Sequence, residues 1–178
     1  MATYYWGDEK EMNHKDNSVY ILASILSILY LLYGVIQFYE GTIAWWFPWI
    51  GGDEIQLGVK IGEAYIPNAF PDPFSGIILI IIGVIFARSI YLSKRNPGLA
   101  DGFLFVGWIL ALLMLILNLV VLAADILDTY YPLIWGGKID EPWTLGSDPW
   151  GISPHLILGI IATPIYWKIK PLLKQLIP

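Results

Sequence analysis

Four long apolar runs constrain this chain more than any other feature of its sequence. Three of them cover residues 18–39, 74–92 and 103–124, and a shorter fourth covers residues 152–167. A hydrocarbon core about 30 Å thick is crossed by about 20 helical residues, and inside it the helix itself must satisfy the backbone polar groups. We therefore expect an all-α integral membrane protein with four transmembrane helices in a single membrane domain, residues 1–178.

The composition supports this class and excludes several kinds of site. Of the 178 residues, 57% are hydrophobic and 14% are charged, which is far more apolar than a typical soluble domain. There is no cysteine, so thiolate metal sites are excluded. The two histidines, His14 and His155, lie in a polar tail and in the fourth run, so paired-histidine haem ligation is not expected. No phosphate loop, Ser-His-Asp set or spaced His cluster is visible, and we expect no metal site and no cofactor carried by this chain alone.

The basic residues predict how the runs are oriented. Cytoplasmic segments near membrane ends are enriched in Lys and Arg. Basic residues gather around the link between the second and third runs and after the fourth run: Arg88, Lys94, Arg95, Lys168, Lys170 and Lys174. We therefore expect both termini to be cytoplasmic, with residues 1–17 as a polar tail. Two long loops, at about 40–73 and 125–151, then face outward from a cell membrane.

The expected outer loops are acidic. They hold ten of the fifteen acidic residues: Glu40, Asp53, Glu54, Glu63, Asp72, Asp125, Asp128, Asp140, Glu141 and Asp148. Nucleic acids and anionic lipid head groups are themselves negative and would be repelled by such a surface. We therefore expect no nucleic-acid partner.

Two stretches in these loops resemble each other. FPWIGGDE at residues 47–54 matches YPLIWGGKIDE at residues 131–141, and DPFSG at residues 72–76 matches DPWG at residues 148–151. The chain therefore reads as two parallel helix-loop-helix repeats, at about 18–95 and 101–178.

Two interpretations of the aromatic and acidic residues in these stretches stay open. Tryptophan and tyrosine favour the membrane interface, where the repeats would form structural caps. Alternatively, the caps form a docking surface or an outward pocket for a partner. The docking residues would be Trp45, Trp46, Trp49, Asp53, Glu54, Trp135, Asp140, Glu141, Trp143 and Trp150.

The apolar runs contain few side chains that could take part in chemistry. They carry almost no ionisable residue at mid-depth, which disfavours an ion path or a secondary transporter. Near the expected outer helix ends lie Glu40, Asp125, Asp128 and His155. In an antiparallel bundle these four can converge and hydrogen-bond or protonate a quinone head group. In the alternative interpretation the three acids are solvated helix-end residues and His155 follows Pro154 in a first helical turn.

Small and helix-breaking residues predict local packing. Ser24, Ser27 and Gly34 in the first run and Gly83 in the second are expected to ease close helix contact. Pro164 in the fourth run is expected to kink that helix, unless a neighbour satisfies the carbonyl that proline leaves free.

The four-run layout also resembles a known family. The first run, SVYILASILSILYLLYGVIQFYEG, leads into a long aromatic outer loop, and this arrangement is similar to the DoxD/DoxX group of small four-helix membrane proteins. DoxD-like chains are membrane subunits of thiosulfate:quinone oxidoreductase in acidophilic archaea. The abundance of Ile and Tyr with few Arg is compatible with a thermophilic archaeal source.

The resemblance implies an accessory or quinone-facing subunit of a respiratory electron-transfer complex. Its expected partners are the lipid bilayer and other membrane or extracytoplasmic subunits, and quinone is its expected ligand. Two other classes stay open: a structural or assembly protein whose outer loops dock a partner without doing chemistry, and a small-molecule transporter.

Overall fold

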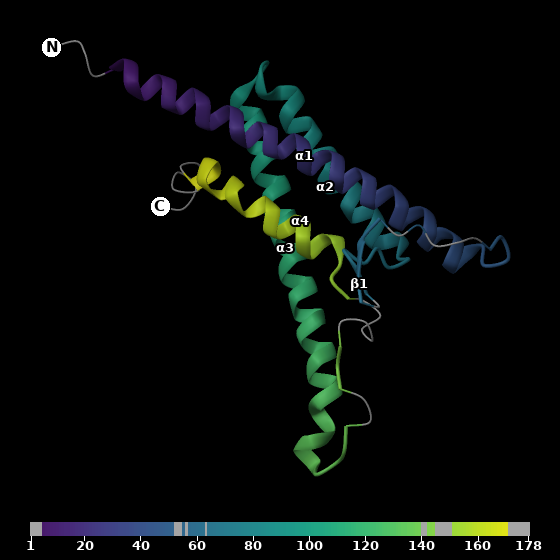
Figure 1. Cartoon of the computed structure of the whole chain (residues 1–178). Helices are drawn as coiled ribbons and strands as arrows, with labels where there is room; N and C mark the ends of the chain where they lie inside the picture. Colours follow the sequence, from purple (N-terminus) through teal and green to yellow (C-terminus); the bar gives the residue numbers. More distant parts are fainter. Residues whose placement is uncertain are drawn as a thin grey trace.

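The computed structural model describes residues 5–51, 55, 57–62, 64–139, 142–144 and 151–170, with side chains from residue 18 onward. Figure 1 shows a helical molecule with a small two-stranded hairpin. The elements in chain order are α1 (Tyr5–Trp46), β1 (Val59–Ile61), β2 (Ala64–Ile66), α2 (Pro73–Ser93), α3 (Pro97–Tyr130), the 3-10 helix η1 (Tyr131–Trp135), α4 (Pro154–Ala162) and the 3-10 helix η2 (Thr163–Ile165).

Among the described residues, three helical segments are long and apolar enough to cross a membrane: Ser18–Trp46, Pro73–Ser93 and Pro97–Trp135. This finding supports a multi-pass membrane protein. The second segment extends the expected run by one residue at each end. The first and third are longer than expected: α3 alone has 34 residues, or about 50 Å of helix, against a hydrocarbon core of about 30 Å.

The fourth apolar run forms a broken helix. α4 has 9 residues and ends at Ala162, η2 follows, and residues 166–170 are again helical. Pro164 has no N–H and would leave the carbonyl of Ile160 without its helical donor. Instead, the backbone N–H of Thr163 donates to that carbonyl, and the Thr163 hydroxyl also donates to it at 2.7 Å. The interruption predicted at Pro164 is confirmed, and the broken run is not among the three spanning segments.

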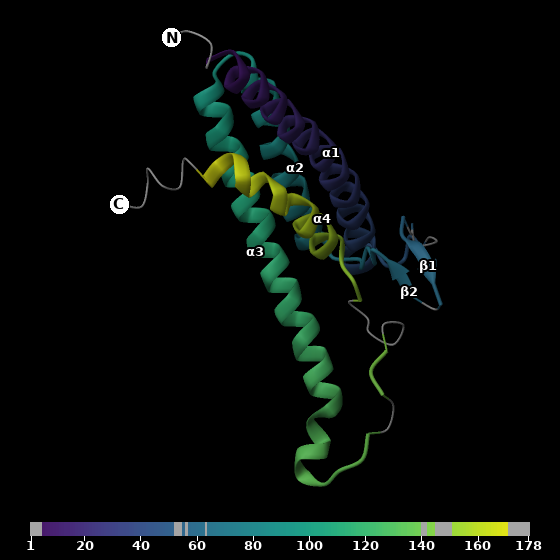
Figure 2. The same ribbon diagram turned by 60° about the vertical axis from the view of Figure 1, so that its left-hand side comes forward.

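The helices form an incomplete bundle. α1 packs along α2, α2 packs along α3, and α4 lies across α3 and also reaches α1 (Figures 1 and 2). Residues 94–96 join α2 to α3, and the Asn96 side chain caps α3 by accepting a hydrogen bond from the N–H of Leu99 at 3.2 Å. At the same end of the bundle, the Tyr20 hydroxyl donates to Asp101 at 2.8 Å.

Small residues allow the helices to approach closely. A Cβ added at Gly34 would lie 2.8 Å from the backbone nitrogen of Ile80, and one at Gly159 would lie 2.7 Å from Cβ of Leu115. The Ser27 hydroxyl donates to the carbonyl of Gly83 at 2.9 Å and joins α1 to α2. Apolar helices gain little by hiding from apolar lipid, so such close contacts and interhelical hydrogen bonds hold them together. The expected packing role of Ser27, Gly34 and Gly83 is confirmed.

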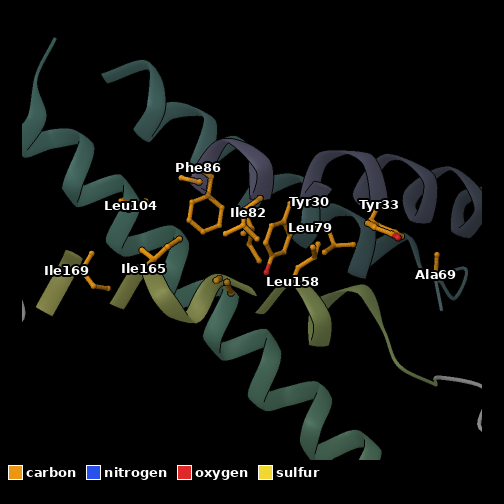
Figure 3. Close-up of a cluster of buried hydrophobic side chains, with 14 residues drawn as sticks. Tyr30, Tyr33, Ala69, Leu79, Ile82, Phe86, Leu104, Leu158, Ile165 and Ile169 are labelled. Carbon is orange, nitrogen blue, oxygen red and sulfur yellow. The ribbon is translucent and has the colours of Figure 1, made fainter. Parts of the chain in front are cut away.

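The core lies where the four helices meet. Figure 3 shows Tyr30, Leu79, Phe86 and Leu158 converging from α1, α2 and α4, with Leu104 on α3. The Tyr30 and Phe86 rings lie 6.0 Å apart between centroids. These side chains are buried against protein, whereas many residues on the opposite helix faces are exposed.

The segments between the helices differ from the expected loops. α1 continues past Glu40 to Trp46, and α3 continues past Asp125 to Tyr130, so both loops begin later than expected. The first contains the antiparallel pair β1 and β2, in register Val59 with Ile66, which the sequence reading missed because each strand has only three residues. The two loops meet where the N–H of Asn68 donates to the carbonyl of Ile152 at 2.7 Å.

The C-terminal half of α3, residues 116–130, extends beyond the other helices. Figure 2 shows it projecting alone from the bundle, with η1 at its tip. The buried residues of α3 end at Leu115. Beyond that point Val120, Leu127 and Trp135 are 60%, 69% and 76% exposed, so this region presents a large apolar surface to its surroundings.

Candidate functional site

A pocket of about 240 Å³ lies between α1, α2 and α3, beside the segments that lead into α2 and α4. Its walls mix aromatic and aliphatic side chains with five polar ones. The lining residues are Gln37, Phe70, Asp72, Phe74, Ser75, Ile78, Met114, Leu117, Asn118, Val121 and Ser153. A cavity of about 150 Å³ can hold benzene, so this pocket has room for one substituted ring.

The first turn of α2 forms one side of the pocket. Asp72 is the N-cap, and its carboxylate accepts a hydrogen bond from the N–H of Phe74 at 2.9 Å. Pro73 occupies the first helical position, where its missing N–H costs nothing. This Asp-Pro pair therefore starts α2, and the turn places Ser75 in the pocket wall.

Ser75 contacts the histidine of the fourth apolar run. Its Oγ lies 2.8 Å from Nε2 of His155, which is 1% exposed and stands second in α4. Nδ1 of His155 has no hydrogen-bond partner among the described residues. The serine thus connects the pocket to a buried imidazole that has one ring nitrogen unused.

Gln37 contributes a buried amide from α1. It is 3% exposed, and its Nε2 donates to the carbonyl of Phe70 at 2.8 Å. A carbonyl can only accept, so the nitrogen must face Phe70 and Oε1 must be the other end of the amide. Within the described part of the chain, Oε1 is buried without a partner. Such a group costs free energy unless something donates to it.

Asn118 and Ser153 close the side formed by α3. Nδ2 of Asn118 donates to the carbonyl of Met114 at 2.9 Å, and Oδ1 accepts from the Ser153 hydroxyl at 2.7 Å. Ser153 is also the residue before α4. This pair therefore ties the start of α4 to the middle of α3.

Two tryptophans stand behind the aromatic wall. The rings of Trp45 and Trp46 contact the ring of Phe74 edge-on, at 5.9 and 6.4 Å between centroids. Aromatic walls beside a few polar groups are typical of sites for small amphipathic molecules. Within the described residues, no group of three His, Cys, Asp or Glu side chains is placed to hold a metal ion.

None of the four residues expected to form a quinone or proton site lines the pocket itself. His155 joins the pocket through Ser75. Glu40 is buried one turn beyond Gln37 on α1, and its carboxylate accepts a hydrogen bond from the N–H of Ile55 in the first loop. Asp125 and Asp128 are four and seven residues past Val121, which lines the pocket, or about 6 and 10 Å farther along α3. The convergence of all four residues stays a prediction.

The expected docking residues are only partly described. Trp45, Trp46, Trp49 and Trp135 are exposed, and Trp143 is partly buried. Asp53, Glu54, Asp140, Glu141 and Trp150 lie outside the described residues.

Sequence reasoning did not assign a role to most residues of the pocket. It did not combine Gln37 and Asn118 with Asp72, Ser75 and Ser153. One signal was present: Gln37 precedes Glu40 by three residues, so both lie on one face of α1. The pairing of Ser75 with His155, 80 positions apart, required the fold.

Comparison with protein-family models, with curated proteins and with solved structures found no match to this chain. Its function is therefore inferred from its own residues and their arrangement.

Proposed function

We propose that this chain is a quinone-facing integral membrane subunit of an electron-transfer complex, in which the pocket holds the quinone ring. The observation that carries the proposal is the buried, unpartnered Oε1 of Gln37 in a pocket with otherwise aromatic and aliphatic walls. A quinone that cycles between its carbonyl and hydroxyl forms matches both features, because its ring is flat and apolar and its hydroxyl form can donate to Oε1. The family resemblance to DoxD-like subunits supports the same function.

The pocket wall also suits such a ligand. Phe70 and Phe74 offer ring faces and edges, and Ser75, Asn118 and Ser153 offer hydroxyl and amide groups. Electron transfer itself needs a redox centre, which we assign to partner subunits, because we expect this chain to carry none.

A binding experiment tests the proposal. The chain, extracted gently with any co-migrating subunits, is reconstituted in lipid nanodiscs and incubated with a short-chain quinone, and empty nanodiscs correct for partition into lipid. We expect saturable binding that Ser75→Ala weakens about tenfold. Ser89→Ala is the matched control, because Ser89 is a buried serine on the same helix outside the pocket, and it should bind as the unaltered chain does. Equal binding by protein-containing and empty nanodiscs would refute the proposal.

The membrane topology belongs to the same proposal. We infer four spans arranged as a parallel duplication, with the broken fourth run completing the bundle and both termini in the cytoplasm. The chain has no cysteine, so single cysteines can report topology directly. With a membrane-impermeant maleimide on intact cells, we expect Lys60→Cys to be labelled and Lys94→Cys to be protected. The reverse pattern would invert the topology.

A second function, that of a scaffold, is favoured by the projecting half of α3. Its exposed apolar residues and the tryptophan at its tip form a surface of the kind that marks contact with lipid or with another protein. If the chain is a scaffold, partner subunits bind the projecting half of α3 and stay bound when the pocket is altered. If the chain only binds quinone, no partner subunit binds this surface.

A further inference from the structure

We propose that the pocket selects the reduced form of its ligand, a hydroquinone, over the oxidised quinone. This inference rests on the proposed function and adds the redox state of the ligand. A hydroquinone carries two hydroxyl donors at opposite ring positions, whereas a quinone carries two carbonyl oxygens that can only accept. The hydrogen-bonding character of the pocket therefore distinguishes the two forms.

The side chains of the pocket present mainly acceptors. The orientation of the Gln37 amide is fixed by Phe70, which leaves Oε1 as the unpartnered end. Asp72 is a carboxylate, which accepts only, and the N–H of Phe74 uses one of its several acceptor positions. Gln37 lines the pocket, so a ligand hydroxyl placed beside it can donate to Oε1. A quinone carbonyl placed there would meet an acceptor and leave Oε1 unsatisfied.

Ser75 can take the second hydroxyl. Ser75 lies in the wall with its Oγ 2.8 Å from Nε2 of His155. When a ligand hydroxyl donates to this Oγ, the serine proton is directed to Nε2. His155 then carries its proton on Nδ1, so the pair forms a chain of two hydrogen bonds that ends on the buried imidazole. No covalent bond is made or broken in this binding step.

The apolar walls distinguish a ring from a simple cation. Phe70, Ile78, Met114 and Val121 surround the polar groups, and a small hydrated cation would have to lose water against them. A hydroxylated ring keeps its apolar faces against these side chains and directs its hydroxyls to the acceptors.

The test compares one ring in both redox states. Duroquinone and durohydroquinone are titrated anaerobically into nanodiscs that contain the whole chain, with empty nanodiscs as the reference for partition. We expect the reduced form to bind at least tenfold more tightly. Each factor of ten raises the midpoint potential of the bound two-electron couple by about 30 mV, which a redox titration measures independently.

Variants locate the origin of the selectivity. Gln37→Met removes the acceptor while keeping the length of the side chain, and it should abolish most of the preference but retain binding of the oxidised ring. Ser75→Ala should reduce the preference less, and Ser89→Ala should leave it unchanged. Saturable binding of the oxidised ring, retained in Gln37→Met and about tenfold weaker in Ser75→Ala, also shows that each variant is folded.

The outcomes separate the two proposals. Equal affinity for both forms, or tighter binding of the quinone, overturns the inference while the proposed function stands. A preference that persists in both Gln37→Met and Ser75→Ala also overturns it. Absence of binding by either form overturns the proposed function, and with it the inference.

Discussion

The two halves of α3 share one helix but differ in what surrounds them. In residues 97–115 a regular stripe is buried against α2 and α4, formed by Ala100, Leu104, Gly107, Ala111 and Leu115. In residues 116–130 no position is buried, although the helix is continuous and the segment as a whole is strongly apolar. The contrast shows that an apolar helix can be packed against other helices or left exposed. The apolar pattern alone does not decide which of the two occurs.

The cause is where the neighbouring helices begin. α2 starts after Asp72 and α4 starts after Ser153, and both of these residues line the pocket together with Asn118. Beyond Asn118, α3 has no parallel helix beside it among the described residues. The pocket therefore lies at the boundary between the packed and projecting halves, where the bundle opens.

The largest difference between the halves is expected for leucine truncation. Leu104→Ala should cost about 2–5 kcal/mol of stability, toward the lower end, because lipid is as apolar as leucine and mainly packing is lost. Leu127→Ala, the same change at a residue that is 69% exposed, should cost less than about 0.5 kcal/mol. Denaturant titration in mixed micelles measures both. A comparable loss at Leu127 would show that the projecting half is covered in the assembled protein.

A smaller loss of stability is expected when a methyl group is added at the contact between α4 and the packed half of α3. Gly159→Ala places a methyl group 2.7 Å from Cβ of Leu115, and α4 must shift at a cost of about 1–3 kcal/mol. Gly102→Ala is the control, because its added methyl would meet no atom within 4 Å. Thermal unfolding followed by circular dichroism compares the two. Equal melting temperatures would contradict the close contact of α3 and α4.

One hydrogen bond links the boundary between the halves to the start of α4. Ser153→Ala removes the donor to Oδ1 of Asn118 and should cost about 1 kcal/mol, with a weaker hold of the ligand in the pocket. Ser93→Ala removes a hydroxyl that donates to the carbonyl of Ile90 in its own helix, and it should leave ligand binding intact. The measurement is ligand affinity alongside stability. An unchanged affinity in Ser153→Ala would remove this serine from the site.

The smallest effect on stability is expected at the tip of the projecting half. Ile134→Ser and Trp135→Ser change residues that are 73% and 76% exposed, so the isolated chain should change by less than about 0.5 kcal/mol. If the tip contacts a partner subunit, the double variant should lose that subunit during purification. Full retention of all partners would argue against a docking role for this surface.

Prediction from sequence succeeded where one local property dominates. The second apolar run became α2 almost without change, because its ends carry Asp72-Pro73 and the turn at residues 94–96. Pro164 interrupted the fourth run because a missing N–H acts wherever it occurs. The packing roles of Gly34 and Gly83 followed from the absence of side chains that would separate two apolar helices.

Prediction failed where several distant segments must be combined. Four acidic or imidazole side chains were expected to converge from their positions near helix ends, but none of them lines the pocket, and His155 meets it through Ser75. The meeting of the two loops at Asn68 and Ile152 was likewise invisible in the sequence.

The sequence by itself determined that the chain is helical, apolar enough to cross a membrane several times, and free of thiolate chemistry, because each of these follows from composition and from short-range pattern. Only the tertiary structure decided which polar groups share a pocket. It also decided that, among the described residues, Oε1 of Gln37 has no donor and half of α3 has no helix beside it. These depend on where each helix starts relative to the others. That placement is set by the packing of surfaces from distant parts of the chain, and no single run of residues records it.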